Sequence, residues 1–200
     1  MSTMNEVINY YDPSEEKKSK KMEPGVYPCH IIKCDVKENI AVRNKYRAKI
    51  FNYRVKIHEE AKNHKYEITN IAGAKEQVTG EGYIGYEVRS AGVFNFIAPG
   101  PEASFEPNPS GNKRYLDFVN GLGIECPEKE IEINGEKKVV KVLPNVEEAD
   151  CLGSPVMAVI NYGKPWKDKD GNQRTSLEVK SITQWKEGST IDVELEDLPF

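Results

Sequence analysis

Apolar and polar side chains alternate most clearly in residues 49–57. One parity carries the apolar side chains, which are Phe51, Tyr53, Val55 and Ile57. The other parity carries polar side chains, which are Asn52, Arg54, Lys56 and His58. Alternation with a period of two is typical of a strand that buries one face. We therefore predict a strand whose inner face lies in the core and whose outer face is basic.

Further strands are expected on both sides of this segment. Residues 26–36 are rich in β-branched and apolar side chains and predict the first strand. Residues 83–97 predict a third strand that Gly92 interrupts, because a glycine inside a strand often marks a bulge or a sharp bend. Between them, the polar residues 59–82 contain a short candidate strand at residues 66–71. We expect this insertion to form an extra hairpin.

Helical spacing appears in two short segments. Apolar side chains recur every three or four positions in residues 113–122, which predicts a helix capped by Asn112 or Ser110. A second helix of one or two turns is expected at residues 145–152, with Asn145 as its cap. Both helices are short, so the strands are expected to dominate the fold.

Turn residues indicate two hairpins in the second half of the chain. An Asn-Gly pair stands between alternating runs in residues 130–142, and Asn-Gly is the strongest short hairpin signal. The last two long strands are expected at residues 156–162 and 174–185. A loop at residues 163–173 would join them.

The order of strand, strand, strand, helix, strand and strand predicts a fold class. We expect an all-β protein with short helices: a five-stranded oligonucleotide/oligosaccharide-binding (OB) barrel with an inserted β-hairpin and a short helix between strands three and four. A β-sandwich is the alternative, but it does not explain where the basic residues fall. The expected organisation is a flexible N-terminal arm at residues 1–23, the barrel domain at residues 24–187 and an acidic tail at residues 188–200.

Charge is distributed unevenly along the chain, whose formal net charge is -4. Residues 39–58 carry six Lys or Arg side chains and no Asp or Glu, whereas residues 188–200 carry four acids and no Lys or Arg. A concentrated positive field attracts polyanions. In the predicted barrel, the basic segment covers the loop between the first two strands and the outer face of the second strand.

Cations interleaved with aromatic rings are typical of single-stranded nucleic-acid binding, because cations follow the phosphates and bases stack on the rings. This pattern occurs in the basic segment, in the loop at residues 163–173 and at two phenylalanines of the third strand. The candidate nucleic-acid-binding residues are Arg43, Lys45, Tyr46, Arg47, Lys49, Asn52, Arg54, Lys56, Phe94, Phe96, Lys164, Trp166, Lys167 and Lys169. A basic edge strand without a ligand is the alternative, but it does not explain a tryptophan in a hydrophilic loop.

Other chemistry finds little support in the sequence. The four cysteines lack any CxxC pair, so we predict no metal site and expect reduced thiols. The glycines of residues 80–85 match the spacing of a dinucleotide fingerprint, but a strand and not a helix is expected to follow them. No histidine has a recognisable nucleophile context. We predict no cofactor and no enzymatic activity.

The last residues of the chain carry the most specific motif. Acids precede the closing residues Asp197, Leu198, Pro199 and Phe200. This end resembles single-stranded-DNA-binding proteins, whose bacterial members end in an acidic tail that closes with an aliphatic residue, proline and phenylalanine. The acidic stretch departs from that pattern because Val193 and Leu195 interrupt it. The resemblance implies that these four closing residues bind replication or recombination proteins.

The body of the chain is similar to phage-encoded single-stranded-DNA-binding proteins of the same barrel class. The similarity rests on the segments Gly25-Val26-Tyr27, Gly121-Leu122-Gly123 and Gly153-Ser154-Pro155-Val156. It implies largely sequence-independent coating of single-stranded DNA in replication, recombination and repair. A recombination or annealing accessory protein that acts mainly through protein contacts is the alternative.

Cellular context follows from what the chain does not contain. No run approaches eighteen apolar residues, and the first thirty residues lack the features of a signal peptide. We therefore expect no membrane partner and a cytoplasmic location, in a bacterial host cell if the protein is phage-encoded. The sequence leaves open whether the protein acts as a monomer or as a homodimer.

Overall fold

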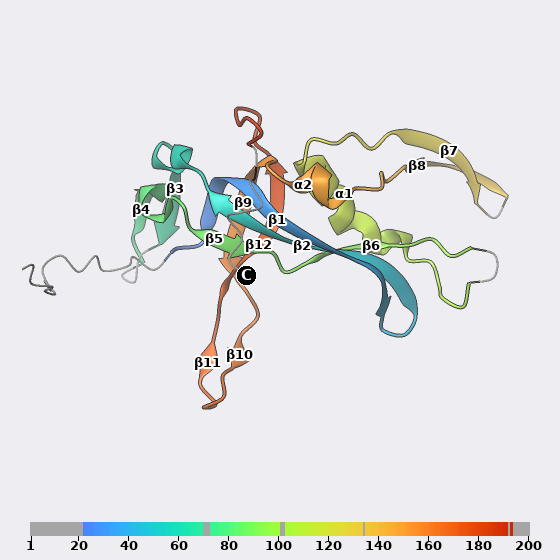
Figure 1. The fold of residues 1–200 in the computed structure, drawn as a ribbon, viewed down its shortest axis with the longest axis horizontal. Coiled ribbons are helices and arrows are strands. Elements are labelled where there is room, and N and C mark those ends of the chain that lie inside the picture. The colour runs from blue at the N-terminus through green and yellow to red at the C-terminus, as the bar shows by residue number, and fades with distance from the viewer. Residues whose placement is uncertain (1–21, 70–72, 101–102, 134, 192, 194–200) are drawn as a thin grey trace, which may run out of the picture.

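Strands dominate the computed structural model of the protein, which describes residues 22–69, 73–100, 103–133, 135–191 and 193 (Figure 1). The strands are β1 (Gly25–Val42), β2 (Tyr46–Ile57), β3 (Lys65–Thr69), β4 (Lys75–Thr79), β5 (Glu87–Arg89), β6 (Val93–Phe96), β7 (Glu128–Ile133), β8 (Glu136–Lys141), β9 (Pro155–Tyr162), β10 (Trp166–Lys167), β11 (Gln173–Arg174) and β12 (Leu177–Gln184). The helices are α1 (Lys113–Gly121), α2 (Glu148–Cys151) and the 3₁₀ turns η2 (Glu59–Lys62), η3 (Gly80–Tyr83) and η4 (Pro109–Asn112). The predicted all-β class with short helices is confirmed.

The long strands form one antiparallel sheet, the main sheet, in the order β12-β9-β1-β2-β5, and β6 also pairs with β2. β5 and β6 are successive parts of the predicted third strand, which breaks at Gly92 (φ 84°) as expected. Beyond β5, Ser90 makes an isolated parallel bridge with Val179 of β12. Within the described residues this bridge is the only pairing between the two edges, so the sheet is not closed into a barrel.

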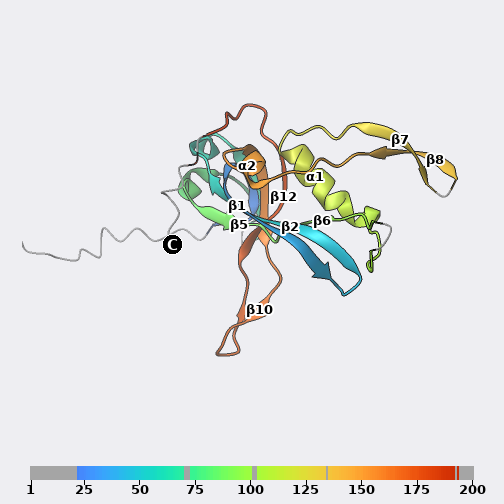
Figure 2. The same ribbon diagram turned by 45° about the vertical axis from the view of Figure 1, so that its right-hand side comes forward.

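The hairpin of β1 and β2 is longer than the sequence predicts. β1 continues to Val42 and β2 begins at Tyr46, so a tight turn replaces the expected loop. Arg43 and Asn44 both adopt positive φ angles (52° and 53°), and the Lys45 N–H donates to the Val42 carbonyl at 3.1 Å. Two successive left-handed residues give a turn that matches the right-handed twist of paired strands. The turn lies at the end of a hairpin that reaches out of the body (Figures 1 and 2).

The core lies between the inner face of the main sheet and α1. The buried side chains of β2 are those predicted by the alternation: Phe51, Tyr53, Val55 and Ile57. From α1, Tyr115 stacks on Phe51 with ring centroids 5.3 Å apart, and Phe118 stacks on Tyr53 at 5.2 Å. Burying an aromatic side chain of this kind contributes about 1.5–3 kcal/mol. The stacked rings therefore hold α1 against β2.

Asn112 is the N-cap residue of α1, as predicted, but its side chain does not cap the helix, and the predicted cap of α2 is wrong. The Asn112 side chain accepts a hydrogen bond from the Phe96 N–H (2.6 Å) and donates to the Phe96 carbonyl (3.1 Å). It therefore extends the edge of β6 and makes no side-chain cap for α1. The predicted Asn145 cap of α2 is wrong, because Glu147 is the N-cap and forms a capping box with Asp150. A carboxylate can accept from the backbone N–H groups of the first turn as well as an amide can.

Three hairpins of the described residues extend from the main sheet. β3–β4 and β7–β8 confirm the hairpins predicted around residues 66–71 and 130–142. β10–β11 occupies most of the segment at residues 163–173, which we expected to be a loop, and ends at Arg174. The β10–β11 hairpin and the end of the β1–β2 hairpin project on the same side of the body, while β7–β8 extends past α1 (Figures 1 and 2).

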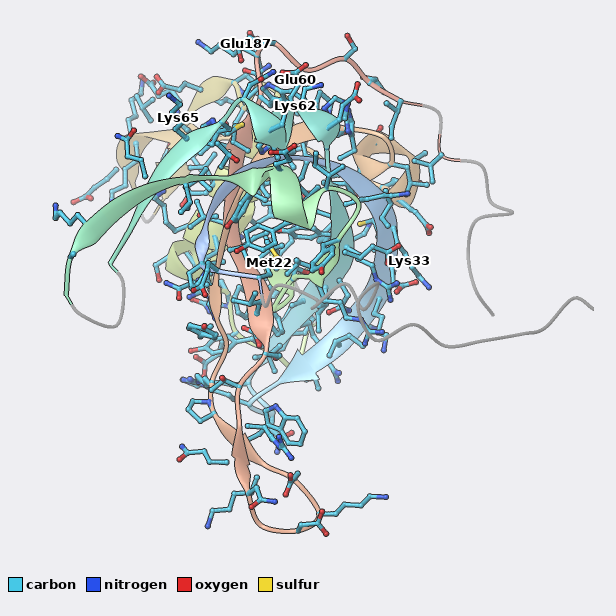
Figure 3. All side chains as sticks on the ribbon, turned by 90° about the vertical axis from the view of Figure 1, so that its left-hand side faces the viewer. Met22, Lys33, Glu60, Lys62, Lys65 and Glu187 are labelled. Carbon is cyan, nitrogen blue, oxygen red and sulfur yellow. The ribbon has the colours of Figure 1, made fainter. Side chains whose placement is uncertain are left out.

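Residues 185–191, here called the C-terminal strap, fold back over one end of the main sheet. His30 Nε2 donates to the Ser189 carbonyl at 2.8 Å, and the Ile191 N–H donates to the Gly153 carbonyl at 3.1 Å. Glu187 of the strap lies at the opposite end of the molecule from the β10–β11 hairpin (Figure 3). No helix within the described residues is long and apolar enough to cross a membrane.

Candidate nucleic-acid interface

Three cations stand in one row across the outer face of the main sheet. Lys33 of β1 is the register partner of Arg54 in β2, and Arg54 is in turn the register partner of Arg89 in β5. Directly opposed residues share one face of a sheet, and like charges in this arrangement are destabilising. This cationic row (Lys33, Arg54 and Arg89) is therefore a place where a bound anion would relieve repulsion within the fold.

Two carboxylates offset part of the charge of the cationic row. Arg54 Nη1 lies 2.7 Å from Glu87 Oε2, and Lys33 Nζ lies 3.5 Å from Asp35 Oδ1. Arg89 is exposed and has no ion-pair partner in the described part of the chain. A depression of about 350 Å³ lies beside these side chains. An anion can therefore approach the row directly.

Aromatic rings continue the same face beyond the cationic row. Phe94 and Phe96 of β6 lie opposite Ile50 and Ala48, which share the parity of Arg54 in β2. The two phenylalanine rings are 6.1 Å apart between centroids, with 19° between their planes, and Tyr46 meets Phe96 edge-on at 5.8 Å. All three rings of this aromatic cluster (Tyr46, Phe94 and Phe96) are half-buried. They leave part of their surface for stacking with bases.

The turn between β1 and β2 carries two of the predicted cations. Arg43 is exposed, and so is Lys45, whose Nζ lies 2.7 Å from Glu106 Oε2 and 5.8 Å from the centroid of the Tyr46 ring. The hydrogen bond and the charge of Glu106 raise the pKa of Lys45. On the outer face of β2, Lys56 is exposed and opposite a carboxylate of β5, and Asn52 lies beside the row.

Arg47 and Lys49 have the parity of Phe51, and Lys49 lies on the core side of β2. Lys49 is only 6% exposed, and its Nζ lies 3.0 Å from Glu38 Oε1 and 3.2 Å from Asn145 Oδ1. The expectation that Lys49 belongs to the outer basic face is therefore wrong. The signal that was missed is the spacing itself, because residues 49 and 51 differ by two and therefore share a face of the strand.

The β10–β11 hairpin presents the remaining predicted residues on an ordered arm. Asp168 accepts hydrogen bonds from the backbone N–H groups of Asp170 (3.1 Å) and Asn172 (2.8 Å), and pairs with Arg174 Nε at 2.9 Å. The hydrogen bond from Arg174 is the main cause that holds the pKa of Asp168 below its usual value. Trp166 is 53% exposed. Three exposed lysines accompany it: Lys164, Lys167 and Lys169.

Lys33 and Arg89 were not among the residues that sequence reasoning selected. A β-bulge at Ile31/Lys33 shifts the parity of β1, and the break at Gly92 shifts that of the third strand. Their alignment with Arg54 depends on register, which a single strand does not reveal. The four predicted residues of the acidic end, Asp197, Leu198, Pro199 and Phe200, lie outside the described residues.

Among the described residues, no group of His, Cys, Asp and Glu side chains is arranged to hold a metal ion. Cys29, Cys34 and Cys151 are buried free thiols, and burial raises the pKa of Cys29.

Comparison of the chain with protein-family models, with curated proteins and with solved structures found no match.

Proposed function

We propose that the protein is a non-catalytic protein that binds single-stranded DNA with little sequence preference during replication or recombination. The observation that carries this proposal is the meeting of the cationic row and the aromatic cluster on one face of the main sheet. Cations follow the phosphate backbone, and each base stacked on a ring contributes about 1–3 kcal/mol. A duplex hides the faces of its bases, so exposed rings favour a single strand.

We further assign the main sheet to the OB class. The order β12-β9-β1-β2-β5, the bridge between Ser90 and Val179 and the position of α1 between the third and fourth long strands support this assignment. An OB fold is a partly open barrel that binds its ligand on strands two and three, between the loops that join strands 1–2 and 4–5. The corresponding elements here are β2, β5–β6, the Arg43 turn and the β10–β11 hairpin, which together carry most of the candidate residues.

A second candidate function is that of a recombination or annealing accessory protein that acts mainly through protein contacts. The β7–β8 hairpin favours it, because the hairpin extends past the body and Val139 is 67% exposed on it. An exposed apolar side chain on a projecting hairpin suits a protein partner. Under this alternative, single-stranded DNA would bind weakly or not at all.

Titration of a fluorescein-labelled dT oligomer at several salt concentrations tests the proposal. The association constant should fall steeply with salt, with a log–log slope of about -0.7 for each phosphate that the protein contacts. Oligomers of different sequence should bind with similar affinity. Absence of measurable binding at low salt, or binding without salt dependence, would overturn the proposal in favour of the accessory role.

A further inference from the structure

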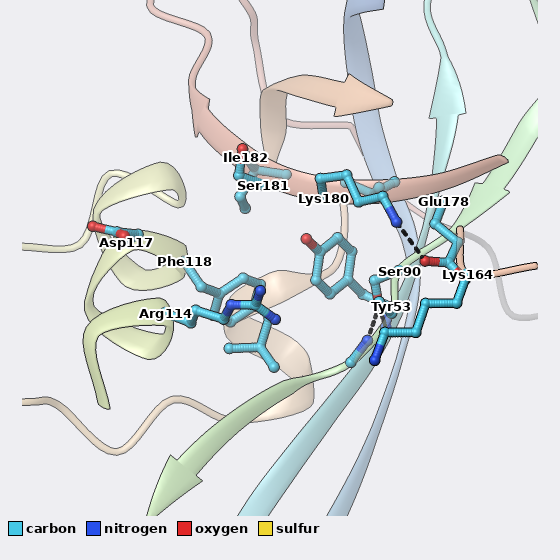
Figure 4. A pocket seen from close by; sticks show the side chains of 14 residues that line it. Tyr53, Ser90, Arg114, Asp117, Phe118, Lys164, Glu178, Lys180, Ser181 and Ile182 are labelled. Atoms are coloured by element: carbon cyan, nitrogen blue, oxygen red, sulfur yellow. Dashed lines mark hydrogen bonds and ion pairs between the residues drawn. The ribbon is translucent and has the colours of Figure 1, made fainter. Parts of the chain in front are cut away.

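A cavity of about 600 Å³ lies where the main sheet stays open, between the break in the third strand, α1 and β12 (Figure 4). Phe118 and Tyr53 line its core side, and Arg114 and Lys164 are among the charged residues of its lining. Volumes of 300–1,000 Å³ are typical of small-ligand sites. Tyr53 and Ser90 also line the depression beside the cationic row, so the two hollows adjoin.

The charges around this cavity do not cancel. Both acids of the lining are already ion-paired, in the pairs Lys180–Glu178 (2.8 Å) and Lys113–Asp117. Arg114 and Lys164 have no ion-pair partner within the residues that the structure describes. Their side chains reach toward the opening from opposite sides, Arg114 from α1 and Lys164 from the base of the β10–β11 hairpin (Figure 4). The opening therefore has two free positive charges facing each other.

Ser90 adds a hydrogen-bond donor to the lining. Its Oγ accepts from the backbone N–H groups of Tyr53 (3.0 Å) and Gly92 (3.4 Å). A hydroxyl has two acceptor lone pairs and one proton, so the Ser90 proton is left to donate. The cavity thus combines cations at its opening, a hydroxyl donor and an apolar floor of the buried rings Phe118 and Tyr53, and these groups suit a phosphate, a base edge and an apolar base face.

We propose that this cavity takes one nucleotide of the bound strand, with its base turned inward toward Phe118 and its phosphate between Arg114 and Lys164. The inference rests on the proposed function. A strand that runs from the cationic row to Trp166 passes the opening, because Ser90, the chain neighbour of Arg89, and Lys164, two residues before Trp166, both line the cavity. One base then leaves the stack at this point.

A cavity-filling substitution tests the inference without changing any charge. Ser181 and Thr183 are both exposed, lie two residues apart on β12 and share a parity, but of these two only Ser181 lines the cavity. Ser181→Tyr should weaken binding of a dT oligomer about tenfold, which corresponds to the loss of roughly one base contact. Thr183→Tyr should bind as the wild type does. Equal affinity of both variants, each folded by circular dichroism, would overturn the inference.

Two neighbouring cations of α1, Arg114 and Lys113, give a second test that is independent of the first. Arg114→Gln should flatten the salt dependence of oligomer binding by about 0.7 on a log–log plot. Lys113→Gln removes the same charge one residue earlier, from a lysine already paired with Asp117, and should leave the slope unchanged. Equal slopes for wild type and Arg114→Gln would contradict the placement of a phosphate at Arg114.

Photocrosslinking locates the base directly. A dT oligomer carrying 5-iodouracil, irradiated in complex with the full chain, should crosslink to the peptides that contain Phe118 or Tyr53, and Ser181→Tyr should abolish those crosslinks. Crosslinks confined to the aromatic cluster and Trp166 would overturn the inference and leave the proposed function standing. Absence of oligomer binding by the wild type would overturn both.

Discussion

The cationic row of the main sheet and the β7–β8 hairpin are both rich in charge, but their strand registers place charges in opposite ways. In β7–β8, register partners of opposite sign face each other, as in Glu128–Lys141 and Glu132–Lys137. In the main sheet, Lys33, Arg54 and Arg89 face one another with the same sign. Cross-strand pairs of opposite charge each contribute roughly 0.2–1 kcal/mol, whereas like pairs are destabilising.

This difference separates charges that stabilise their own strands from charges that repel one another, and the proposed function gives the second kind a ligand. A two-stranded hairpin is marginal by itself, so the pairs of β7–β8 help to stabilise an element that has few other contacts. The cationic row lies on a sheet that is already held by a large core and adds repulsion to it. Binding of a polyanion, as proposed above, would relieve this repulsion.

The largest expected effect comes from neutralising the row. The triple variant Lys33→Gln, Arg54→Gln and Arg89→Gln loses about three phosphate contacts, so the log–log salt slope of oligomer binding should flatten by about 2. The matched control changes three lysines of β8 by the same charge: Lys137→Gln, Lys138→Gln and Lys141→Gln. Fluorescence anisotropy at four salt concentrations measures both slopes. An equal change in the two triple variants would show that net charge matters and position does not.

A second prediction tests whether base stacking on aromatic rings adds to the binding free energy that the cations supply. Trp166→Ala should cost about 1–3 kcal/mol of binding free energy if one base stacks on the indole, and Trp166→Phe should recover part of that loss. Trp166 is 53% exposed while Trp185 is 8% exposed, so quenching of intrinsic fluorescence by DNA should come from Trp166. Quenching that persists undiminished in Trp166→Ala would exclude the β10–β11 hairpin as a stacking platform.

The comparison also predicts that removing one cation from the cationic row and one from β7–β8 changes stability in opposite directions. Arg89→Gln removes a like-charged neighbour of Arg54 and should raise the free energy of unfolding by about 0.2–1 kcal/mol. Lys137→Gln removes the cation that lies 2.9 Å from Glu130 and should lower the protection of the β7–β8 amides against hydrogen exchange. Chemical denaturation measures the first effect and exchange monitored by NMR measures the second. Destabilisation by Arg89→Gln would mean that the row supports the fold after all.

The smallest expected effect is that of acidification, which should lower the stability of the fold without changing the salt dependence of DNA binding. Burial is the first cause that lowers the pKa of His30, and the charge of His58 also lowers it, against the hydrogen bond to Ser189. A depressed pKa means that the folded state favours neutral His30, so this stabilisation is present above the ordinary pKa of about 6.5 and is lost as the pH falls below it. The melting temperature should therefore fall between pH 7 and pH 5.5, and less so in His30→Gln.

Binding should respond differently over the same pH range. The cationic row contains only Lys and Arg, which stay charged, so the salt slope of oligomer binding should be the same at pH 7 and pH 5.5. A slope that steepened with acidification would indicate that His30 or His58, which lie beside the C-terminal strap, contacts DNA.

Local signals in the sequence predicted much of the fold. The alternation of residues 49–57 identified the buried face of β2, and the Asn-Gly pair identified the β7–β8 hairpin. Gly92 marked the break between β5 and β6. Each of these features depends on residues that are neighbours in the chain, so the local sequence pattern is enough to predict it.

Features that depend on strand register or on contacts between distant segments could not be predicted from the sequence. The cationic row needs three strands in a particular alignment, and two β-bulges on β1, one on either side of Lys33, each shift the register by one residue. The burial of Lys49 depends on Glu38 and Asn145, which meet it only in the folded chain. Arg114 and Lys164 are fifty positions apart, and only the packing of α1 against β12 brings them to one cavity.

Competition between single-stranded and duplex DNA tests the central claim most directly. A labelled dT oligomer bound to the wild-type chain is displaced by unlabelled single strand or by duplex of equal nucleotide concentration, at a fixed salt concentration. If the rings and the cationic row act together, the single strand should displace the probe at concentrations at least tenfold lower than the duplex. Equal displacement by the two competitors would show that charge alone attracts DNA and would contradict a single-strand-binding face on the main sheet.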